Sequence, residues 1–416
     1  MEKDQFSFMG DNAKQEVLQK KLTEADMKDV EATMSASSAS NNKHLDYIYK
    51  LLEVMVSKKG SDMFITAGFP PAMKLNGSIE PLSSQAIDYK VAAEFVKSVM
   101  NDKQRAEFEE TNECNFAISH PGIGRFRVNA FRQRGSAGMV MRVINTTIPN
   151  LADLGVPEQL KKIIMEKRGL VIVVGATGSG KSTTLAAMIG HRNATQPGHI
   201  ITIEDPIEFV HTHNRSIITQ REVGVDTEGW HAALKNTLRQ APDVILIGEV
   251  RDRDTMEYAI AFAETGHLCL CTLHANNSNQ ALDRIINFFP EERRHQLLMD
   301  LSLNLKSIVS QRLIPSKEKG RVPAVEILLN SPFISDLIFK GEVTGIKEAM
   351  KKGREQGMQT FDQALFDLYE LHSISFEDAI RNADSANDLR LNIKLHSKRG
   401  LPDDKSDSLS KLQVLG

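Results

Sequence analysis

The sequence predicts an α/β protein with a mostly parallel sheet, preceded by a smaller α/β domain. From Glu158 onward, segments of strand and helix character alternate at the spacing of a parallel sheet covered by helices on both faces. Within this region, residues 170–174 form an uninterrupted apolar run, which is typical of a fully buried strand. The chain has 416 residues, more than one ordinary hydrophobic core organises, so two domains are expected.

A glycine-rich loop follows the buried strand directly and opens the next helix. It has the Walker A pattern, and glycines let successive N–H groups turn toward one anion at the positive end of that helix. Lys181 then supplies a charge to the β- and γ-phosphates of ATP, and the Ser182 hydroxyl can bind Mg²⁺. A chance glycine-rich turn is disfavoured because strand, loop and helix agree. The predicted nucleotide-binding residues are Gly175, Ala176, Thr177, Gly178, Ser179, Gly180, Lys181, Ser182 and Thr183.

Two further strands of this domain are expected to end in carboxylates. Residues 199–203 are rich in β-formers and lead into Glu204, the first acid of the segment EDPIE. Residues 243–247 include four consecutive aliphatic side chains and lead to Glu249, as a Walker B strand does. Because open α/β sheets bind ligands at the carboxyl ends of their strands, we expect both acids near the phosphate-binding loop. A loop-capping role for Glu204 is the alternative.

A histidine stands at each end of another predicted strand. Residues 268–273 are apolar, with His267 before them and His274 after them. A histidine at a strand end is more often a satisfied structural group than a catalyst, so the position of each residue must decide its role.

The smaller domain is expected to present arginines from a hairpin. Residues 125–131 alternate, so that Arg127 lies on the face opposite Phe126 and Val128. After a turn, residues 139–144 form a second strand that carries Arg142. A solvated sheet face is the simpler interpretation of these arginines, and a role toward a nearby ATP site is the other.

Changes in composition divide the chain into four segments. Residues 1–43 are polar and resemble a flexible leader, and residues 44–150 form the smaller domain. Residues 151–391 form the nucleotide-binding domain, and residues 392–416 form a polar, disordered tail. Within the larger domain, leucines and isoleucines at helical spacing predict one helix over residues 291–313.

Charge and cysteine content limit the class of protein. The formal net charge of −3 gives no bulk attraction to nucleic acid, so no direct nucleic-acid partner is expected. The three cysteines lack the spacing of a metal site or a disulfide framework and fit a reducing compartment. The first residues do not have the pattern of a signal peptide, and no apolar run approaches the ~20 residues of a membrane span. We therefore expect a cytoplasmic protein that reaches a membrane only through partners.

Five segments in fixed order resemble one ATPase superfamily: GATGSGKSTT, ITIEDPIE, ITQREVG, ILIGEVRD and TGHLCLCTLHANN. They are similar to the secretion-superfamily ATPases and, most closely, to the type IV pilus retraction ATPases of twitching motility (the PilT/PilU family). The Walker A motif alone indicates only an NTPase, whereas the set is specific. FRVNAF in the smaller domain and GMQTFDQAL near the end indicate the retraction branch. The resemblance covers about residues 44–391.

The resemblance implies the architecture of a ring motor. It implies a PAS-like N-terminal domain, a RecA-like ATPase domain, and a hexamer in which each N-terminal domain packs on a neighbour's ATPase domain. It also implies hydrolysis of ATP to ADP and phosphate with Mg²⁺. Ser182 would bind the metal, and Glu249 would orient a magnesium-bound water.

The resemblance further assigns roles to the remaining polar residues. Glu204 would polarise the attacking water. His267 and His274 match the histidine box, in which His274 would sense the γ-phosphate. Arg127 and Arg142 match the family's inserted arginines, which would reach the γ-phosphate when the domains close and so link the ATP cycle to domain geometry.

Two segments depart from the pattern of the family's principal retraction ATPase. Lys347 and Lys351 stand where the family's C-terminal motif has arginines, and lysine lacks the planar guanidinium fork. The segment GSDMFITAGFPPAMKLNG is also closer to the accessory member. The implied partners are a paralogous retraction ATPase and an inner-membrane pilus platform protein, reached at the cytoplasmic face of the inner membrane.

Two other functions compete with pilus retraction. An assembly-type ATPase of secretion or DNA uptake would usually carry a tetracysteine ribbon and a long N-terminal module, and the sequence contains neither. A nucleotide-gated adaptor that docks on a partner ring would turn over little ATP. The intact Walker residues favour catalysis over such an adaptor.

Overall fold

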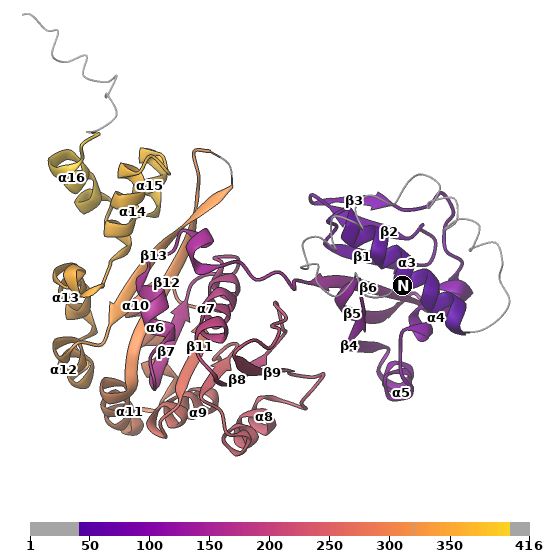
Figure 1. The fold of residues 1–416 in the computed structure, drawn as a ribbon, viewed down its shortest axis with the longest axis horizontal. Coiled ribbons are helices and arrows are strands. Elements are labelled where there is room, and N and C mark those ends of the chain that lie inside the picture. Colours follow the sequence, from indigo (N-terminus) through magenta and orange to yellow (C-terminus); the bar gives the residue numbers. More distant parts are fainter. Residues whose placement is uncertain (1–40, 319, 400–416) are drawn as a thin grey trace, which may run out of the picture. The chain divides into compact units, whose positions relative to one another are not determined.

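The structure, a computed structural model, describes residues 41–318 and 320–399 of the chain. These residues form two compact units that divide between Thr146 and Thr147 (Figure 1). The leader was expected at residues 1–43, and its residues 1–40 lie outside the described residues, as does the part of the expected tail at residues 400–416. Residues 41–43 instead belong to helix α3 (Asn41–Ser57), so this boundary was predicted too late in the chain.

The first unit is a six-stranded antiparallel sheet with three helices. The strand order is β3-β2-β1-β6-β5-β4. The strands are β1 (Asp62–Thr66), β2 (Ala72–Leu75), β3 (Ser78–Pro81), β4 (Glu113–His120), β5 (Gly124–Gln133) and β6 (Ser136–Ile144). The helices are α3 (Asn41–Ser57), α4 (Tyr89–Ser98) and α5 (Asp102–Thr111), and their apolar faces share one core with the sheet. The PAS-like character of this unit stays a prediction.

The second unit contains a seven-stranded sheet in the order β13-β12-β7-β11-β10-β8-β9. All neighbouring strands are parallel except the pair β12 and β13. The predicted α/β class with a mostly parallel sheet is therefore confirmed. The strands are β7 (Gly169–Val174), β8 (Gly198–Glu204), β9 (Ser216–Glu222), β10 (Val244–Ile247), β11 (Leu268–Leu273), β12 (Leu305–Pro315) and β13 (Arg321–Leu329).

Helices cover both faces of this sheet, because side chains of the central strand β7 alternate between two cores. Leu170, Ile172 and Val174 pack with α8 to α13, whereas Val171 and Val173 pack with α6 and α7. The helices are α6 (Gln159–Ile164), α7 (Lys181–Thr195), α8 (Trp230–Thr237), α9 (Arg253–Glu264), α10 (Ser278–Phe288), α11 (Glu291–Asn304), α12 (Pro332–Lys340), α13 (Ile346–Lys352), α14 (Phe361–Glu370), α15 (Phe376–Asn382) and α16 (Ala386–His396).

Two boundaries predicted in the last third of the chain are wrong. The helix expected over residues 291–313 ends at Asn304, and β12 begins at Leu305. The run that follows is buried on both faces of the sheet, with Ile308 in one core and Val309 in the other, so its apolar residues fit a strand as well as a helix. Residues 392–396, expected in the loose tail, belong to α16, whose Leu389 and Ile393 pack on α14 and α15.

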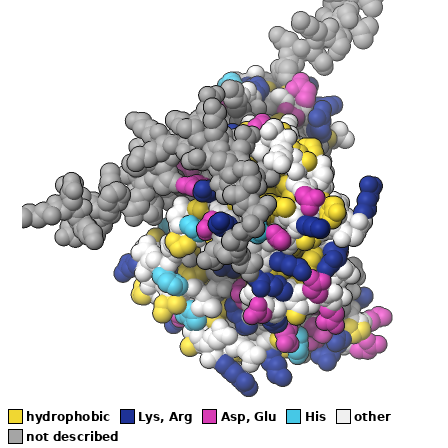
Figure 2. All heavy atoms as spheres, turned by 90° about the vertical axis from the view of Figure 1, so that its right-hand side faces the viewer, with side chains coloured by type: hydrophobic (Ala, Val, Ile, Leu, Met, Phe, Trp, Pro, Cys, Tyr) yellow, Lys and Arg dark blue, Asp and Glu magenta, His cyan; other side chains and the backbone are white. Residues whose placement is uncertain are grey.

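Charge is mixed on the surface. On the face that Figure 2 shows, Lys and Arg side chains are interspersed with Asp and Glu. Among the described residues, no helix combines the length and the apolar character that crossing a membrane requires.

A buried carboxylate joins the start of α10 to the sheet. Glu326 on β13 is 2% exposed, and its Oε1 accepts hydrogen bonds from the Ser278 backbone N–H (2.7 Å), the Ser278 hydroxyl (2.7 Å) and the Ser310 hydroxyl (3.1 Å). Burial raises the pKa of Glu326, although these hydrogen bonds oppose the shift. The folded protein therefore holds a proton at Glu326 at pH values where the unfolded chain has released it.

We predict that the stability of the parent protein, relative to a Glu326→Gln variant, falls as pH rises. Between the ordinary pKa of about 4.5 and the raised pKa, the folded state binds more protons than the unfolded state, so increasing pH favours unfolding of the parent. Glutamine retains an acceptor oxygen and carries no charge. Thermal unfolding measured from about pH 5 to pH 8 should show that the stability of the variant, relative to the parent, increases with pH. A difference that does not change with pH, or an equal gain for Glu80→Gln on exposed β3, would contradict the prediction.

Candidate nucleotide-binding and catalytic site

The phosphate-binding loop connects β7 to α7, and its shape requires glycine. Gly178 and Gly180 have φ of +77° and +88°, in the left-handed region that other residues disfavour. A Cβ on Gly175 would lie 2.4 Å from the Ser179 hydroxyl oxygen, so this approach also excludes a side chain. The loop thereby places backbone N–H groups at the N-terminus of α7, as phosphate binding demands.

Lys181 is held over the loop that it follows. Its ammonium group donates to the backbone carbonyls of Gly175 (2.7 Å) and Ala176 (3.0 Å). Burial lowers the pKa of Lys181, and the negative charge of Glu249 opposes the shift. The predicted cation thus lies inside the loop, close enough to Glu249 for their charges to interact.

Gln311 of β12 is hydrogen-bonded to the loop, and it was not predicted from the sequence as a site residue. Its Nε2 donates to the Ser179 carbonyl (2.8 Å), and its Oε1 accepts from the Thr184 hydroxyl (2.8 Å). The side chain is buried, and a Cβ on Gly180 would lie 2.6 Å from its Nε2. No motif marks this residue, because it follows the loop by more than 130 positions and meets it only through the pairing of β12 with β7.

Parallel strand order brings the predicted acids to the edge that carries the loop. Strand β10 lies between β8 and β11, with Ile247 in register with Ile203. The Gly248 N–H then donates to the Ile203 carbonyl (2.7 Å), and a Cβ on Gly248 would lie 3.0 Å from the Glu204 Cα. Glycine at this position therefore lets the chain segments that carry Glu204 and Glu249 approach closely.

Glu204 lies at the end of β8 in a largely enclosed position. Its Oε1 accepts from the Thr202 hydroxyl (2.6 Å) and from Gln220 Nε2 of β9 (3.2 Å). Burial raises the pKa of Glu204, while the two hydrogen bonds oppose the shift. A carboxylate with a raised pKa accepts a proton more readily than an exposed one, which is a property of general bases.

Glu249 is the centre of an ion-pair cluster. Its Oε2 lies 2.6 Å from an Arg251 terminal nitrogen, and its Oε1 lies 3.1 Å from His274 Nε2. The Glu249 side chain is 19% exposed, and its hydrogen bond and charge raise the pKa of Arg251. Arg251 was not predicted as a site residue, although the quoted segment ILIGEVRD contains it.

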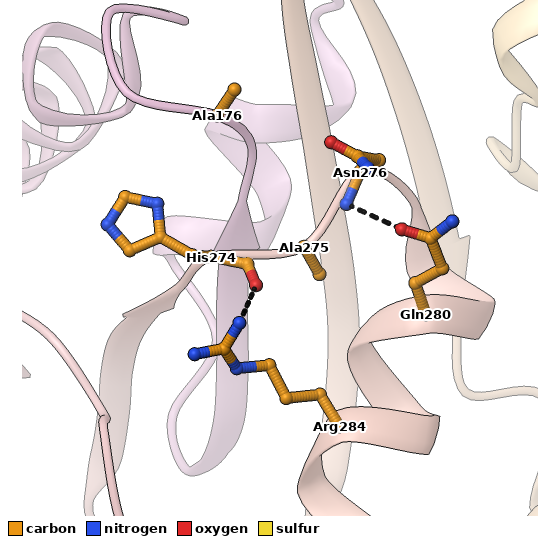
Figure 3. A pocket seen from close by; sticks show the side chains of 6 residues that line it. All are labelled: Ala176, His274, Ala275, Asn276, Gln280 and Arg284. Atoms are coloured by element: carbon orange, nitrogen blue, oxygen red, sulfur yellow. Dashed lines mark hydrogen bonds between the residues drawn. The ribbon is translucent and has the colours of Figure 1, made fainter.

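His274 lies beside the phosphate-binding loop. Leu273 pairs with Val174, so His274 follows β11 where the loop follows β7. Ala176 and His274 line a cavity of about 270 Å³ together with residues at the start of α10. Arg284 donates a hydrogen bond to the His274 carbonyl (3.0 Å), as the dashed line in Figure 3 marks. A second cavity of about 300 Å³ is lined by residues 175–179 of the loop, Gln311 and Arg312 among others.

His267 lies at the opposite end of β11. Its Nδ1 is within hydrogen-bond distance of the Thr265 hydroxyl (3.1 Å) and the Phe262 carbonyl (3.2 Å). The six residues of β11 separate it from His274 by roughly 20 Å at about 3.3 Å per residue. The structure therefore places His267 among local structural contacts, away from the phosphate-binding loop of its own chain.

Arg127 and Arg142 belong to the first unit. They lie directly opposite each other on β5 and β6, and the neighbouring Phe126 and Val128 are buried, as the alternation predicted. Arg142 Nε also donates to Asp62 Oδ1 (2.6 Å), a carboxylate whose side chain is only 5% exposed. Arg142 thus has a structural partner that the sequence did not reveal. A contribution of either arginine to catalysis stays a prediction.

We predict that Gln311→Met loosens the phosphate-binding loop. Methionine has a similar length but leaves the Ser179 carbonyl and the Thr184 hydroxyl without this partner, at about 1–3 kcal/mol for each unsatisfied buried group. Calorimetry should show weaker binding of MgADP together with a lower free energy of unfolding. Gln363→Met provides a control, because Gln363 makes local contacts around the start of α14, remote in sequence from the loop. Unchanged MgADP affinity would exclude this role for Gln311.

Comparison with known proteins places the chain in a family. Residues 47–405 match the family described as Type II/IV secretion system protein. The type IV pilus ATPase PilU of Pseudomonas aeruginosa is 62% identical over 84% of this chain and 92% of its own length. The type IV pilus retraction ATPase PilT of the same organism is 42% identical over 81% of this chain and 98% of its own length.

A solved structure agrees with these relatives. The crystal structure of the pilus retraction motor PilT with bound ADP superposes with a TM-score of 0.76 at 40% identity, covering 81% of this chain and 98% of that chain. The agreement extends to the RecA-like character predicted for the second unit. The chain therefore belongs to the Type II/IV secretion system protein family and, within it, to the type IV pilus retraction ATPases.

Proposed function

We propose that this chain is an ATP-hydrolysing subunit of a ring motor that promotes pilus retraction, and that it acts as the accessory retraction ATPase. One observation carries the proposal. Four parallel strands of one sheet deliver the phosphate-binding loop, His274, Glu249 and Glu204 to the same edge. Phosphate binding, metal-bound water and a proton acceptor are the requirements of ATP hydrolysis, and this edge holds residues suited to each of them.

The loop residues and Glu249 have the chemical groups that binding of MgATP requires. The loop N–H groups and Lys181 match phosphate oxygens, and a hydroxyl at Ser182 with a carboxylate at Glu249 is an oxygen donor set that suits Mg²⁺. When bound, the ion would neutralise charge that develops on the phosphates. The contacts of Glu249 with Arg251 and His274 hold its carboxylate in place at the sheet edge.

Glu204 is the proposed acceptor for the proton of the attacking water. Its buried position raises its pKa, and Thr202 and Gln220 orient the carboxylate. His274 contacts Glu249 and borders the loop, which supports a role in sensing the γ-phosphate. His267 has no comparable support from its position.

Assembly and location extend the proposal. We infer a hexameric ring that operates with a paralogous retraction ATPase and an inner-membrane pilus platform protein, held at the cytoplasmic face of the inner membrane through these partners. Residues 44–150 and 151–391 would act as its moving domains. Arg127 and Arg142 would enter the site on domain closure, so that ATP binding and hydrolysis alternate between two geometries. An accessory role is supported by the 62% identity to PilU, against 42% to PilT.

A steady-state ATPase assay tests the proposed function. The full chain is measured alone and mixed with the paralogous retraction ATPase, and Lys181→Ala serves as the control for contaminating activity. Hydrolysis that disappears in Lys181→Ala supports a motor subunit. Nucleotide binding without turnover in either condition would instead indicate a nucleotide-gated adaptor.

We predict that Glu204→Gln keeps MgATP binding but lowers turnover by at least ~100-fold, the usual scale for loss of a general base. Glutamine preserves the shape and can still accept hydrogen bonds from Thr202 and Gln220, so the fold should persist. Binding titrations and turnover rates are measured on the same preparation. Equal losses of affinity and turnover would assign Glu204 a structural role instead.

We predict that Arg127→Ala and Arg142→Ala each lower turnover severely, because an arginine at a γ-phosphate contributes about 10³–10⁵-fold to rate. Loss of an exposed ion pair of a solvated sheet face contributes too little to mimic this effect, but Arg142 pairs with a nearly buried carboxylate and needs a control of its own. For Arg142 the matched control is Asp62→Asn, which removes the ion pair and retains the arginine. Rates are normalised to folded, assembled protein. If Asp62→Asn loses as much turnover as Arg142→Ala, the loss reflects the structure of the first unit and not the arginine.

A further inference from the structure

We propose that Asp384 couples α13 to the nucleotide-binding edge, by bridging Lys347 of α13 to Arg312, which in turn positions the backbone at Asn276 beside His274. Asp384 and Arg312 are thus positioning residues for the site. The inference rests on the proposed ATPase function and adds the route by which the C-terminal helices influence it.

Arg312 is the centre of this connection. One terminal nitrogen donates to Asp384 Oδ1 (2.7 Å) and to the Asn276 carbonyl (3.1 Å). The other terminal nitrogen donates to the Asn382 carbonyl (2.6 Å), and the guanidinium lies 3.9 Å from the centroid of the Phe361 ring. A single planar fork therefore joins β12, α14, the end of α15 and the turn that follows His274.

Asp384 links two cations from distant parts of the chain. Its side chain is 9% exposed, and Oδ2 accepts a hydrogen bond from the Lys347 ammonium group while Oδ1 contacts Arg312. Burial alone would raise the pKa of Asp384, but Lys347 and Arg312 together hold it below the ordinary value. The Asp384 N–H donates to Asp362 Oδ1 (2.8 Å), which anchors the bridging residue to α14.

The two basic residues of α13 differ in what they contact. Lys351 pairs with Glu348 one turn away on the same helix, an exposed pair of a kind that contributes little. Lys347 instead reaches across to Asp384, between α15 and α16. Displacement of α13 would therefore be transmitted to Arg312 through Lys347.

Residues of the bridge line two cavities, one of which lies beside the phosphate-binding loop. A cavity of about 490 Å³ is lined by Asn276, Gln280, Arg312, Lys347 and Asp384 among others. Asn276 and Arg312 also line the cavity beside the phosphate-binding loop. On β12, Gln311 holds the loop while the next residue, Arg312, holds the C-terminal helices.

This adjacency gives the coupling a physical route. Successive side chains of a strand point to opposite faces, so one strand position contacts the loop and the next contacts the helical region. The Asn276 N–H donates to Gln280 Oε1 (3.2 Å), so the turn after His274 is held from the start of α10 and by Arg312. Loss of the Asp384 bridge would free one of these two restraints.

A double-mutant cycle between Lys347 and Asp384 tests the coupling in the full chain. The variants are Lys347→Met, Asp384→Asn and the double variant, with Lys347→Arg and Arg312→Lys as charge-preserving arms in case Asp384→Asn folds poorly. The matched control is Lys340→Met with Asp336→Asn, a similar ion pair at 2.7 Å that lies exposed on α12. Turnover number, KM for ATP and thermal stability are measured for each, with rates normalised to folded protein.

Positioning predicts a specific pattern. Lys347→Met and Asp384→Asn should each lower the turnover number about 10-fold, the double variant should be no worse than the stronger single one, and KM should change much less. Lys347→Arg should retain the turnover number of the parent, since it keeps the contact with Asp384. Arg312→Lys should lower the turnover number, because a point charge cannot hold Asp384, Asn276 and Asn382 together. Additive losses, or rates within twofold of the parent, would overturn the proposal.

Hydrogen exchange separates this inference from the proposed function. Peptides that cover residues 274–280 should exchange faster in Asp384→Asn and Arg312→Lys, and at the parent rate in Lys340→Met. This readout does not require hydrolysis. An inactive parent with altered exchange would refute the proposed function alone, whereas unchanged exchange would refute the positioning role.

Discussion

The structure of this protein depends on one constraint, the parallel pairing of β8, β10, β11 and β7. Parallel strands end at the same edge, so residues that follow them must meet, however far apart they lie in the sequence. The phosphate-binding loop follows β7, His274 follows β11, Glu249 follows β10 and Glu204 ends β8. Glycine at position 248 is also needed, because a side chain there would push apart the segments that carry Glu204 and Glu249.

The electrostatics of this edge of the sheet follows from the short distances between the residues that meet there. Burial raises the pKa of Glu204 and lowers that of Lys181, so each charged form is disfavoured by the site that holds it. The Glu249 carboxylate offsets the effect at Lys181 and orders His274 and Arg251 around itself. A site with opposed charges at short range is suited to bind phosphate and to move a proton, as ATP hydrolysis requires.

Strand β12 gives the site its connection to the rest of the second unit. It is the inner member of the one antiparallel pair, with the phosphate-binding loop on one side and the C-terminal helices on the other. Polar residues are concentrated here, including Gln311, Arg312 and Glu326 of the neighbouring strand β13, and each joins its strand to other elements of the unit. Buried polar contacts of this kind fix relative positions more specifically than apolar packing does.

The sequence by itself determined the fold class, the phosphate-binding loop and the two acidic strand ends, because these depend on local periodicity and on motifs that span a few residues. It did not determine that residues 305–313 form a strand, since an apolar run buried on both faces has no distinctive period. Nor did it reveal Gln311, the Asp62 partner of Arg142 or the Asp384 bridge. These side chains acquire their roles from strand pairing and helix packing between segments that lie far apart in the sequence. Only the tertiary structure decides which polar groups are buried together.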